Sequence, residues 1–173
     1  MKLENRGQPF RIEVKETILS NGRRFAQCCF FVSDAIIGDF DQYMALGSLE
    51  LAIGDLIGRV KKLPECDLGF VGDIEAVFEG LSKAFLHGDF SFFRAIEECA
   101  QFSDADFNRF SAVPLAVEAF DGEEAYLIKF DGQWRFVWRQ WETKVINSVL
   151  LDRQFFVDKL NLSLNKIANL SDP

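Results

Sequence analysis

Hydrophobic and polar residues alternate along residues 9–19, so that the apolar side chains fall on one side of an extended chain. A period of two predicts a half-buried strand. Asn21-Gly22 follows, and an Asn-Gly pair favours the two-residue turn of a β-hairpin. We therefore expect a return strand over residues 24–32 and a short third strand over residues 35–37.

The apolar period then changes to three or four residues, which predicts helices. The first begins at Ser48, a predicted N-cap, and ends near Lys61-Lys62, where cations suit the helix dipole. A second begins at Asp73 and closes near His87-Gly88. Further helical segments are predicted over residues 91–102, 104–110 and 152–170.

Alternating apolar residues return after the helical region and predict a second set of strands. Asp121-Gly122 and Asp131-Gly132 supply the positive φ angles that two-residue hairpins require, and a third turn is expected near Glu142. The predicted strands cover residues 115–120, 124–130, 133–141 and 143–150.

Strands, then helices, then strands and a final helix indicate an α+β fold. We expect an antiparallel sheet, made of the N-terminal hairpin and a C-terminal β-meander, packed with several α-helices. A chain of 173 residues is long enough to bury one substantial core. The prediction is a single domain over residues 1–173.

Aromatic residues gather in the predicted strand at 133–141, where Trp134, Phe136 and Trp138 point to one side. Such a face could stack nucleic-acid bases, as sheet aromatics do in RNA-recognition domains. The strand lacks the basic residue, glycine and aromatics in the order that those domains use. We therefore interpret it as the inward face of a sheet beneath the last helix.

Net charge, −8 in total, is spread unevenly. Residues 64–129 contain 14 acidic and 4 basic side chains, a net charge of −10, whereas the segments on either side are each at +1. Such a field repels nucleic acid and attracts basic partners. Charge alone is equally compatible with an acidic surface that serves solubility.

Candidate catalytic chemistry is sparse. The four cysteines form no CxxC pair and there is one histidine, so neither a zinc site nor another metal or cofactor site is expected. The sequence has no GxSxG, P-loop or GxGxxG motif. We expect no enzyme, although a hydrolase that uses His87 with Cys66 or Cys99 stays as an alternative.

The first residues contain no apolar core of a signal peptide, and no apolar run approaches the roughly 18 residues that cross a bilayer. We therefore expect a cytoplasmic protein with no membrane contact.

Acidic residues lie beside aromatic residues in the most negative third, and an acidic rim around aromatic anchors suits a protein interface. We expect the partner-binding residues to be Glu97, Glu98, Asp104, Asp106, Asp121, Glu123 and Glu124.

Three segments resemble the Imm42-type immunity proteins of bacterial polymorphic toxin and contact-dependent inhibition systems. They are IIGDFDQYMALGSLELAIGDL (36–56), FDGEEAYLIKFDGQWRFVWRQW (120–141) and VLLDRQFFVDKL (149–160), in that order after the N-terminal strands. The resemblance implies a cytoplasmic, non-enzymatic antitoxin that binds and blocks the toxin domain of a cognate effector. Because many such toxins are nucleases, it also implies a partner with a basic surface.

Within the GDFDQY motif we expect structural roles: Gly38 for the turn out of the third strand, Asp39 or Asp41 as a cap, and Phe40 and Tyr43 packed beneath the first helix. A second functional class stays open, in which an aromatic pocket under Trp134 and Trp138 binds a small ligand or serves an adaptor.

Overall fold

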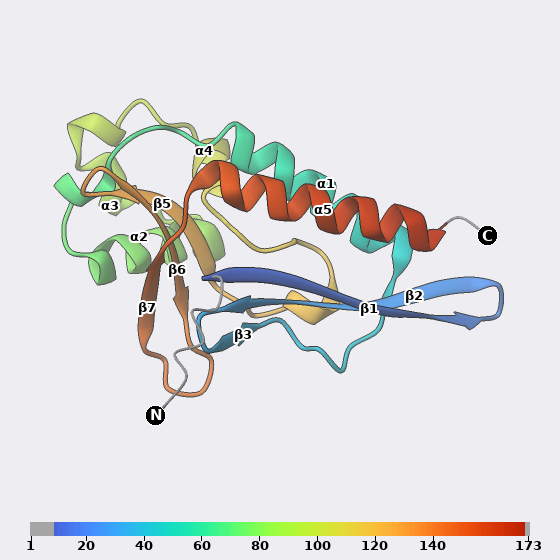
Figure 1. Ribbon diagram of the computed structural model, residues 1–173. Coiled ribbons are helices and arrows are strands. Elements are labelled where there is room, and N and C mark those ends of the chain that lie inside the picture. Colours follow the sequence, from blue (N-terminus) through green and yellow to red (C-terminus); the bar gives the residue numbers. More distant parts are fainter. Residues whose placement is uncertain (1–8, 172–173) are drawn as a thin grey trace.

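The chain forms two antiparallel sheets with helices packed against both (Figure 1). The computed structural model describes residues 9–171, except for the side chains of residues 16–19, 98 and 171. The first sheet has the order β1-β2-β3, with β4 also paired to β2, and the second has the order β5-β6-β7. The strands are β1 (Phe10–Ser20), β2 (Arg23–Val32), β3 (Ala35–Ile37), β4 (Met44–Ala45), β5 (Ala125–Phe130), β6 (Gln133–Arg139) and β7 (Ile146–Leu150).

Two long helices lie next to each other across one face of the β1–β2 hairpin, and shorter helices gather at the second sheet (Figure 1). The α-helices are α1 (Leu46–Lys61), α2 (Ile74–His87), α3 (Ser91–Arg94), α4 (Asp104–Arg109) and α5 (Arg153–Ser171). Short 3₁₀ turns are η1 (Leu68–Phe70), η2 (Glu97–Cys99) and η3 (Glu118–Phe120). The α+β prediction is confirmed, with the N-terminal hairpin and the C-terminal meander in separate sheets.

Two of the predicted hairpin turns form as expected. Asn21 and Gly22 have φ angles of 51° and 74°, and Asp131 and Gly132 have 51° and 76°. Positive φ at both central positions defines the turn that matches strand twist. The Asp67 carboxylate also accepts hydrogen bonds from the Asp131 and Gly132 amides, at 2.9 and 2.5 Å, so the loop before η1 holds the β5–β6 turn in place.

The ends of α2 agree with the sequence prediction. The Asp73 carboxylate accepts from the Ala76 amide at 2.8 Å, and Gly88 closes the helix in the left-handed conformation. Helix α1 begins at Leu46, two residues before the predicted N-cap Ser48, because β4 leads directly into it.

The predicted strand over residues 115–120 is wrong. The segment is irregular and ends in η3, with Ala116 at a φ of 59°. It crosses beside the first sheet, where the Asp39 amide donates to the Ala119 carbonyl at 2.6 Å. Asp121 has a φ of −63° and Gly122 of 79°, so Asp121-Gly122 forms a turn without joining two strands.

The predicted helix over residues 91–102 is also wrong, because it breaks after α3. Ile96 is extended, with φ −114° and ψ 121°, and η2 follows. The break lets Phe93 and Phe102 both contact the Phe107 ring of α4, with centroids 4.8 and 6.0 Å away. A straight helix would not direct both rings toward α4.

The connection between β6 and β7 is longer than the predicted tight turn at Glu142. Strand β6 ends at Arg139 and β7 begins at Ile146. The Gln140 amide donates to the Val145 carbonyl at 2.9 Å, and Lys144 has a φ of 59°. The loop therefore extends past the end of β6, and Trp141 in it is exposed.

A cluster of phenylalanine rings joins the two sheets and the last helix. Phe10 of β1 lies 4.9 Å from Phe156 of α5 and 5.7 Å from Phe136 of β6, measured between ring centroids. Phe30 of β2 contacts Phe10 at 5.3 Å and Phe120 of η3 at 5.0 Å. The expectation that the aromatic face of β6 lies beneath the last helix is confirmed for Phe136, whose ring centroid lies 5.8 Å from that of Phe156.

The GDFDQY motif is partly as predicted. Gly38 has a φ of 97°, as the turn after β3 requires. The predicted cap at the entry to the first helix is wrong: the Asp39 carboxylate accepts from the Asp41 amide at 2.9 Å, and the N-cap residue of α1 is Ala45, which has no side-chain cap. Phe40 and Tyr43 do not lie beneath α1. Phe40 packs on Phe31, on the face of the sheet that α1 does not cover, and Tyr43 is exposed.

We expect Phe156→Ala to lower the free energy of unfolding by about 3–5 kcal/mol, because the ring is fully buried where both sheets meet α5. Urea denaturation followed by circular dichroism measures the change. Phe70→Ala is the matched control: this ring is 85% exposed, and its removal should cost under about 0.5 kcal/mol. Equal losses of unfolding free energy in the two variants would contradict the assignment of Phe156 to the core.

We expect Gly38→Ala to destabilise the fold more than Gly22→Ala. Both glycines have positive φ, which costs an L-residue about 1–2 kcal/mol. A Cβ on Gly22 meets nothing within 4 Å, whereas one on Gly38 lies 2.9 Å from the Phe120 ring and 3.1 Å from the Ala119 carbonyl oxygen. The difference in unfolding free energy between the two variants measures this crowding, and no difference would refute it.

Candidate functional site

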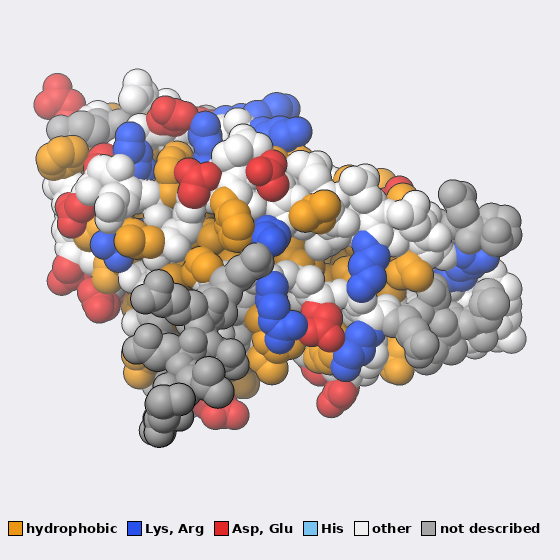
Figure 2. All heavy atoms as spheres, viewed as in Figure 1, with side chains coloured by type: hydrophobic (Ala, Val, Ile, Leu, Met, Phe, Trp, Pro, Cys, Tyr) orange, Lys and Arg blue, Asp and Glu red, His pale blue; other side chains and the backbone are white. Residues whose placement is uncertain are grey.

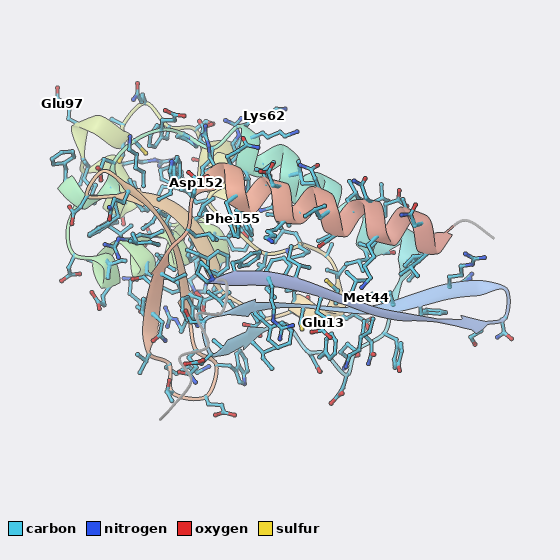
Figure 3. The ribbon with its side chains drawn as sticks, viewed as in Figure 1. Glu13, Met44, Lys62, Glu97, Asp152 and Phe155 are labelled. Carbon is cyan, nitrogen blue, oxygen red and sulfur yellow. The ribbon has the colours of Figure 1, made fainter. Side chains whose placement is uncertain are left out.

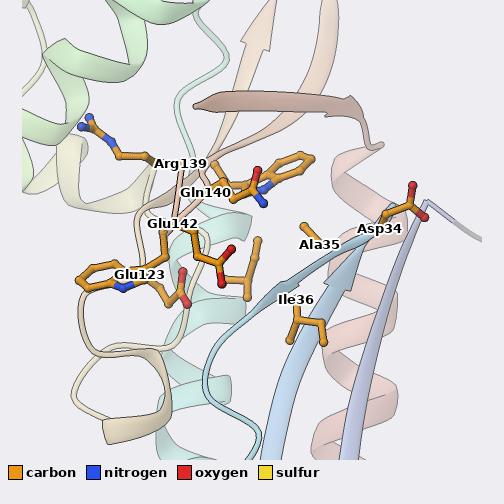
Figure 4. A pocket seen from close by; sticks show the side chains of 10 residues that line it. Asp34, Ala35, Ile36, Glu123, Arg139, Gln140 and Glu142 are labelled. Atoms are coloured by element: carbon orange, nitrogen blue, oxygen red, sulfur yellow. The ribbon is translucent and has the colours of Figure 1, made fainter. Parts of the chain in front are cut away.

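A groove lies between the edge of the first sheet and the end of β6 (Figure 4). Its volume is about 320 Å³, and an adjoining hollow of about 330 Å³ shares Asp34, Ala35, Trp138 and Gln140 with it. One wall is the β2–β3 turn with β3. The other is built from Glu123, the end of β6 and the β6–β7 loop. The groove exists because the two sheets meet without sharing a ladder.

Three carboxylates line this groove: Asp34 on the β3 side, and Glu123 and Glu142 opposite. Among the described residues of the lining, Arg139 is the one basic side chain, and it extends away toward α2 (Figure 4). Its guanidinium pairs with Glu79 at 2.9 Å and with Glu124 at 3.6 Å. Because those two carboxylates already neutralise Arg139, the groove keeps an excess of negative charge.

Glu123 is the half-buried member of the three. Burial raises the pKa of its carboxyl, and the hydrogen bond that it accepts from the Gly38 amide at 3.1 Å acts in the opposite direction. The same hydrogen bond connects the turn before β5 to the end of β3. Glu123 therefore helps to hold the two walls of the groove together.

Two tryptophans contribute to the groove in different ways. Trp138 is only 7% exposed, and its buried indole N–H donates to no hydrogen-bond acceptor among the described residues. Trp141 is 64% exposed, with the Lys144 ammonium 3.8 Å from its ring centroid. The groove thus has a buried, unpaired indole in its wall and an aromatic ring at its rim.

The predicted acidic residues fall into two groups that lie apart. Glu97 stands on η2 at the outer end of the helical region (Figure 3), and Glu98 lies outside the described side chains. Asp104 pairs with Arg94 at 3.2 Å. Asp106 accepts from the Ser103 amide and hydroxyl in a capping box and pairs with Arg109, and these contacts, the serine hydrogen bonds first, lower its pKa.

The second group surrounds the turn before β5. Asp121 is exposed, Glu123 lines the groove, and Glu124 is mostly buried. The Glu124 carboxylate accepts from the Ser82 hydroxyl at 2.5 Å as well as pairing with Arg139. Of the seven predicted residues, the structure therefore brings only Glu123 into the groove.

Asp34 and Glu142 are groove residues that the sequence analysis missed. Each lies in a turn. The two residues are 108 positions apart in the sequence, and no spacing rule connects them. An exposed acid in a turn beside an edge strand is the only signal that could have drawn attention to either.

The residues of the alternative hypotheses are also placed. Trp134 is half-buried, with the Arg153 guanidinium 5.1 Å from its ring centroid, and Trp138 forms the groove wall. His87 is exposed at the end of α2. Burial raises the pKa of the Cys66 thiol to about 12, which keeps it protonated and unreactive at neutral pH.

Within residues 9–171, no three His, Cys, Asp or Glu side chains come together as a metal site would require. In the same part of the chain, no helix has both the length and the apolar character to cross a membrane. Comparison with known protein families, with curated proteins and with solved structures finds no match to the chain.

Glu123→Gln should flatten the pH dependence of stability. An unfolded glutamate ionises near pH 4.3. Because folding raises the pKa of Glu123, this carboxyl binds more protons in the folded chain than in the unfolded chain at pH values between its two pKa values. Its contribution to stability therefore falls as pH rises from the unfolded pKa through the folded pKa. Glutamine does not ionise and still offers an oxygen to Gly38, so the variant should be at least as stable as the wild type at pH 7.

Thermal melts between pH 4 and 7 measure this effect. Glu123→Ala is the matched control, because it also removes the charge but leaves the Gly38 amide without its acceptor. It should show the same flattened slope at lower stability throughout. If Glu123→Gln kept the wild-type slope, Glu123 would not be the source of the pH dependence of stability.

Proposed function

We propose that the protein is an immunity protein, which binds a cognate bacterial toxin domain and blocks its active or substrate-binding surface. The observation that supports this most is the separation of charge on the folded chain. The segment of net charge −10 forms α2, α3, α4 and the turn before β5. Acidic side chains lie along that end in Figure 2 with some Lys and Arg among them, and further Lys and Arg lie over the first hairpin.

The two exposed acids of the predicted interface are its best candidates for contact. Glu97 and Asp121 form no ion pair with a described residue, so a basic partner would displace only water from them. Asp104 and Asp106 already have arginine partners. At the interface these pairs would form part of a polar rim. They would add little net attraction, because exchanging one ion pair for another gains little binding free energy.

A basic toxin surface is the chemistry that this end would recognise. Opposite potentials raise the association rate, and an inhibitor that covers a substrate-binding surface needs no catalytic group of its own. Such a protein would act in the cytoplasm of the cell that makes the toxin. Many nuclease toxins bind nucleic acid through basic surfaces, which an acidic protein could occupy.

A second candidate function is small-ligand binding or an adaptor role. The groove beside Trp138 favours it, since a volume of about 320 Å³ can hold a small molecule. Tryptophan fluorescence that responds to a metabolite but to no basic protein would favour this function over the first.

Co-expression tests the immunity function. We expect the toxin domain encoded immediately upstream of this protein's gene to arrest growth of a susceptible cell. The intact protein should restore growth and co-purify with that domain. Toxicity that persists without complex formation would overturn the proposal.

Charge reversal locates the interface. Glu97→Lys with Asp121→Lys should weaken the complex at least tenfold and reduce its salt dependence, because both exposed carboxylates would then repel the partner. Glu50→Lys on α1 makes the same change at an exposed site outside the acidic segment, and it should leave the affinity unchanged. Equal effects at the three positions would refute the interface and leave the rescue result standing.

A further inference from the structure

Strand β3 has an open edge that faces the groove. Among the described residues it pairs only with β2, and Val32 and Ala35 flank the two-residue turn at Ser33-Asp34. Residues that flank such a turn exchange hydrogen bonds, so the next pair, Phe31 and Ile36, does not. The N–H and C=O of Ile36 therefore point away from β2, along the edge that lines the groove.

The groove supplies more than an acidic cluster. The buried indole N–H of Trp138 lacks an acceptor among the described residues, and an unpaired buried donor costs about 1–3 kcal/mol. The hollow lined by Trp138 also contains the three carboxylates of Asp34, Glu123 and Glu142. An occupant that brings a hydrogen-bond acceptor and a positive charge would satisfy both features.

We propose that this groove binds an extended polypeptide segment bearing lysine or arginine, which adds to the edge of β3. The segment's backbone pairs with the N–H and C=O of Ile36, and one of its carbonyls accepts from the Trp138 indole. Its cationic side chain reaches the carboxylates. The identity of the segment rests on the proposed function, in which it belongs to the toxin, whereas its chemistry follows from the groove.

The chemistry of the walls favours a polypeptide over other occupants. Excess negative charge repels phosphate, which argues against nucleic acid. A free amine would use the carboxylates but leave the backbone groups of Ile36 unused. Ile36 and Trp141 are 56% and 64% exposed at the rim, where they can cover the aliphatic stem of a lysine or arginine.

Strand addition also explains why the groove opens at an edge. Main-chain hydrogen bonds along an edge supply affinity in this mode, and pockets for alternate side chains supply selectivity. β3 has three residues, so the paired stretch is short and the charged pocket provides most of the discrimination.

The test uses the full chain labelled with ¹⁵N and a blocked pentapeptide, acetyl-Thr-Val-Lys-Val-Thr-amide. We expect the indole resonance of Trp138, identified by its loss in Trp138→Phe, and the Ile36 amide resonance to shift on titration. The same peptide with glutamate in place of lysine should bind at least about tenfold more weakly, as expected for reversed charge. N-acetyl-lysine amide, which has the charge without the strand, should also bind more weakly.

Two variants separate the contribution of the carboxylates to peptide binding from that of the Trp138 indole N–H. Asp34→Asn with Glu142→Gln should weaken the lysine peptide and narrow its advantage over the glutamate peptide. Trp138→Phe keeps a ring in the wall but removes the donor, so it should weaken both peptides. Glu50→Lys on α1 is the control outside the groove and should leave peptide binding unchanged.

Several outcomes would overturn the proposal: no shift at Ile36 or Trp138, equal affinity for both peptides, or N-acetyl-lysine amide binding as tightly as the pentapeptide. The last would show a site for a cation alone. These results are independent of the growth rescue. Growth rescue without peptide binding would refute only the groove as a peptide site. Peptide binding without growth rescue would refute the toxin as the source of the segment and leave the groove as a peptide site.

Discussion

The contact of phenylalanine rings between the two sheets is the constraint on which the rest of the structure depends. Phe10, Phe30, Phe136 and Phe156 come from two strands of one sheet, a strand of the other and the last helix. They meet mainly edge to face, an arrangement that ring quadrupoles favour, and the Phe10–Phe136 pair is tilted. Within the described part of the chain no hydrogen-bonded ladder joins β1–β4 to β5–β7, so this apolar contact sets their relative orientation. The groove at β3 follows from that orientation.

Acidic side chains serve two purposes in this protein, and their hydrogen-bond and ion-pair partners separate them. Asp67, Asp73 and Glu124 bind backbone amides, a hydroxyl or an arginine of the fold. Carboxylates with such partners stabilise local structure and contribute little to an external field. Glu97 and Asp121 are left to face solvent. The net charge of the middle third therefore overstates the attraction that its surface exerts.

Glu123 links the architecture to the proposed chemistry. Its hydrogen bond to the Gly38 amide joins the walls of the groove, and the same carboxylate faces the hollow between them. The turn at Gly38 is crowded by Phe120, a neighbour of the ring cluster. Core packing, the turn after β3 and the charge of the groove are thus coupled through a few contacts.

The sequence by itself determined the features that depend on neighbouring residues. Asn21-Gly22 and Asp131-Gly132 specify hairpins through local φ preferences, Asp73 and Gly88 delimit α2, and the alternation around Phe136 identifies a buried face. Local signals of this kind act over a few residues and need no knowledge of the rest of the chain.

Only the tertiary structure decided the features that require distant partners. Residues 115–120 have a strand-like pattern but instead cross beside the first sheet, and residues 91–102 break so that Phe93 and Phe102 can both reach Phe107. Asp34 and Glu142 likewise share a groove through the meeting of two sheets. The physical reason is that contacts between remote segments bury the apolar side chains, and these contacts override local propensity wherever the two compete.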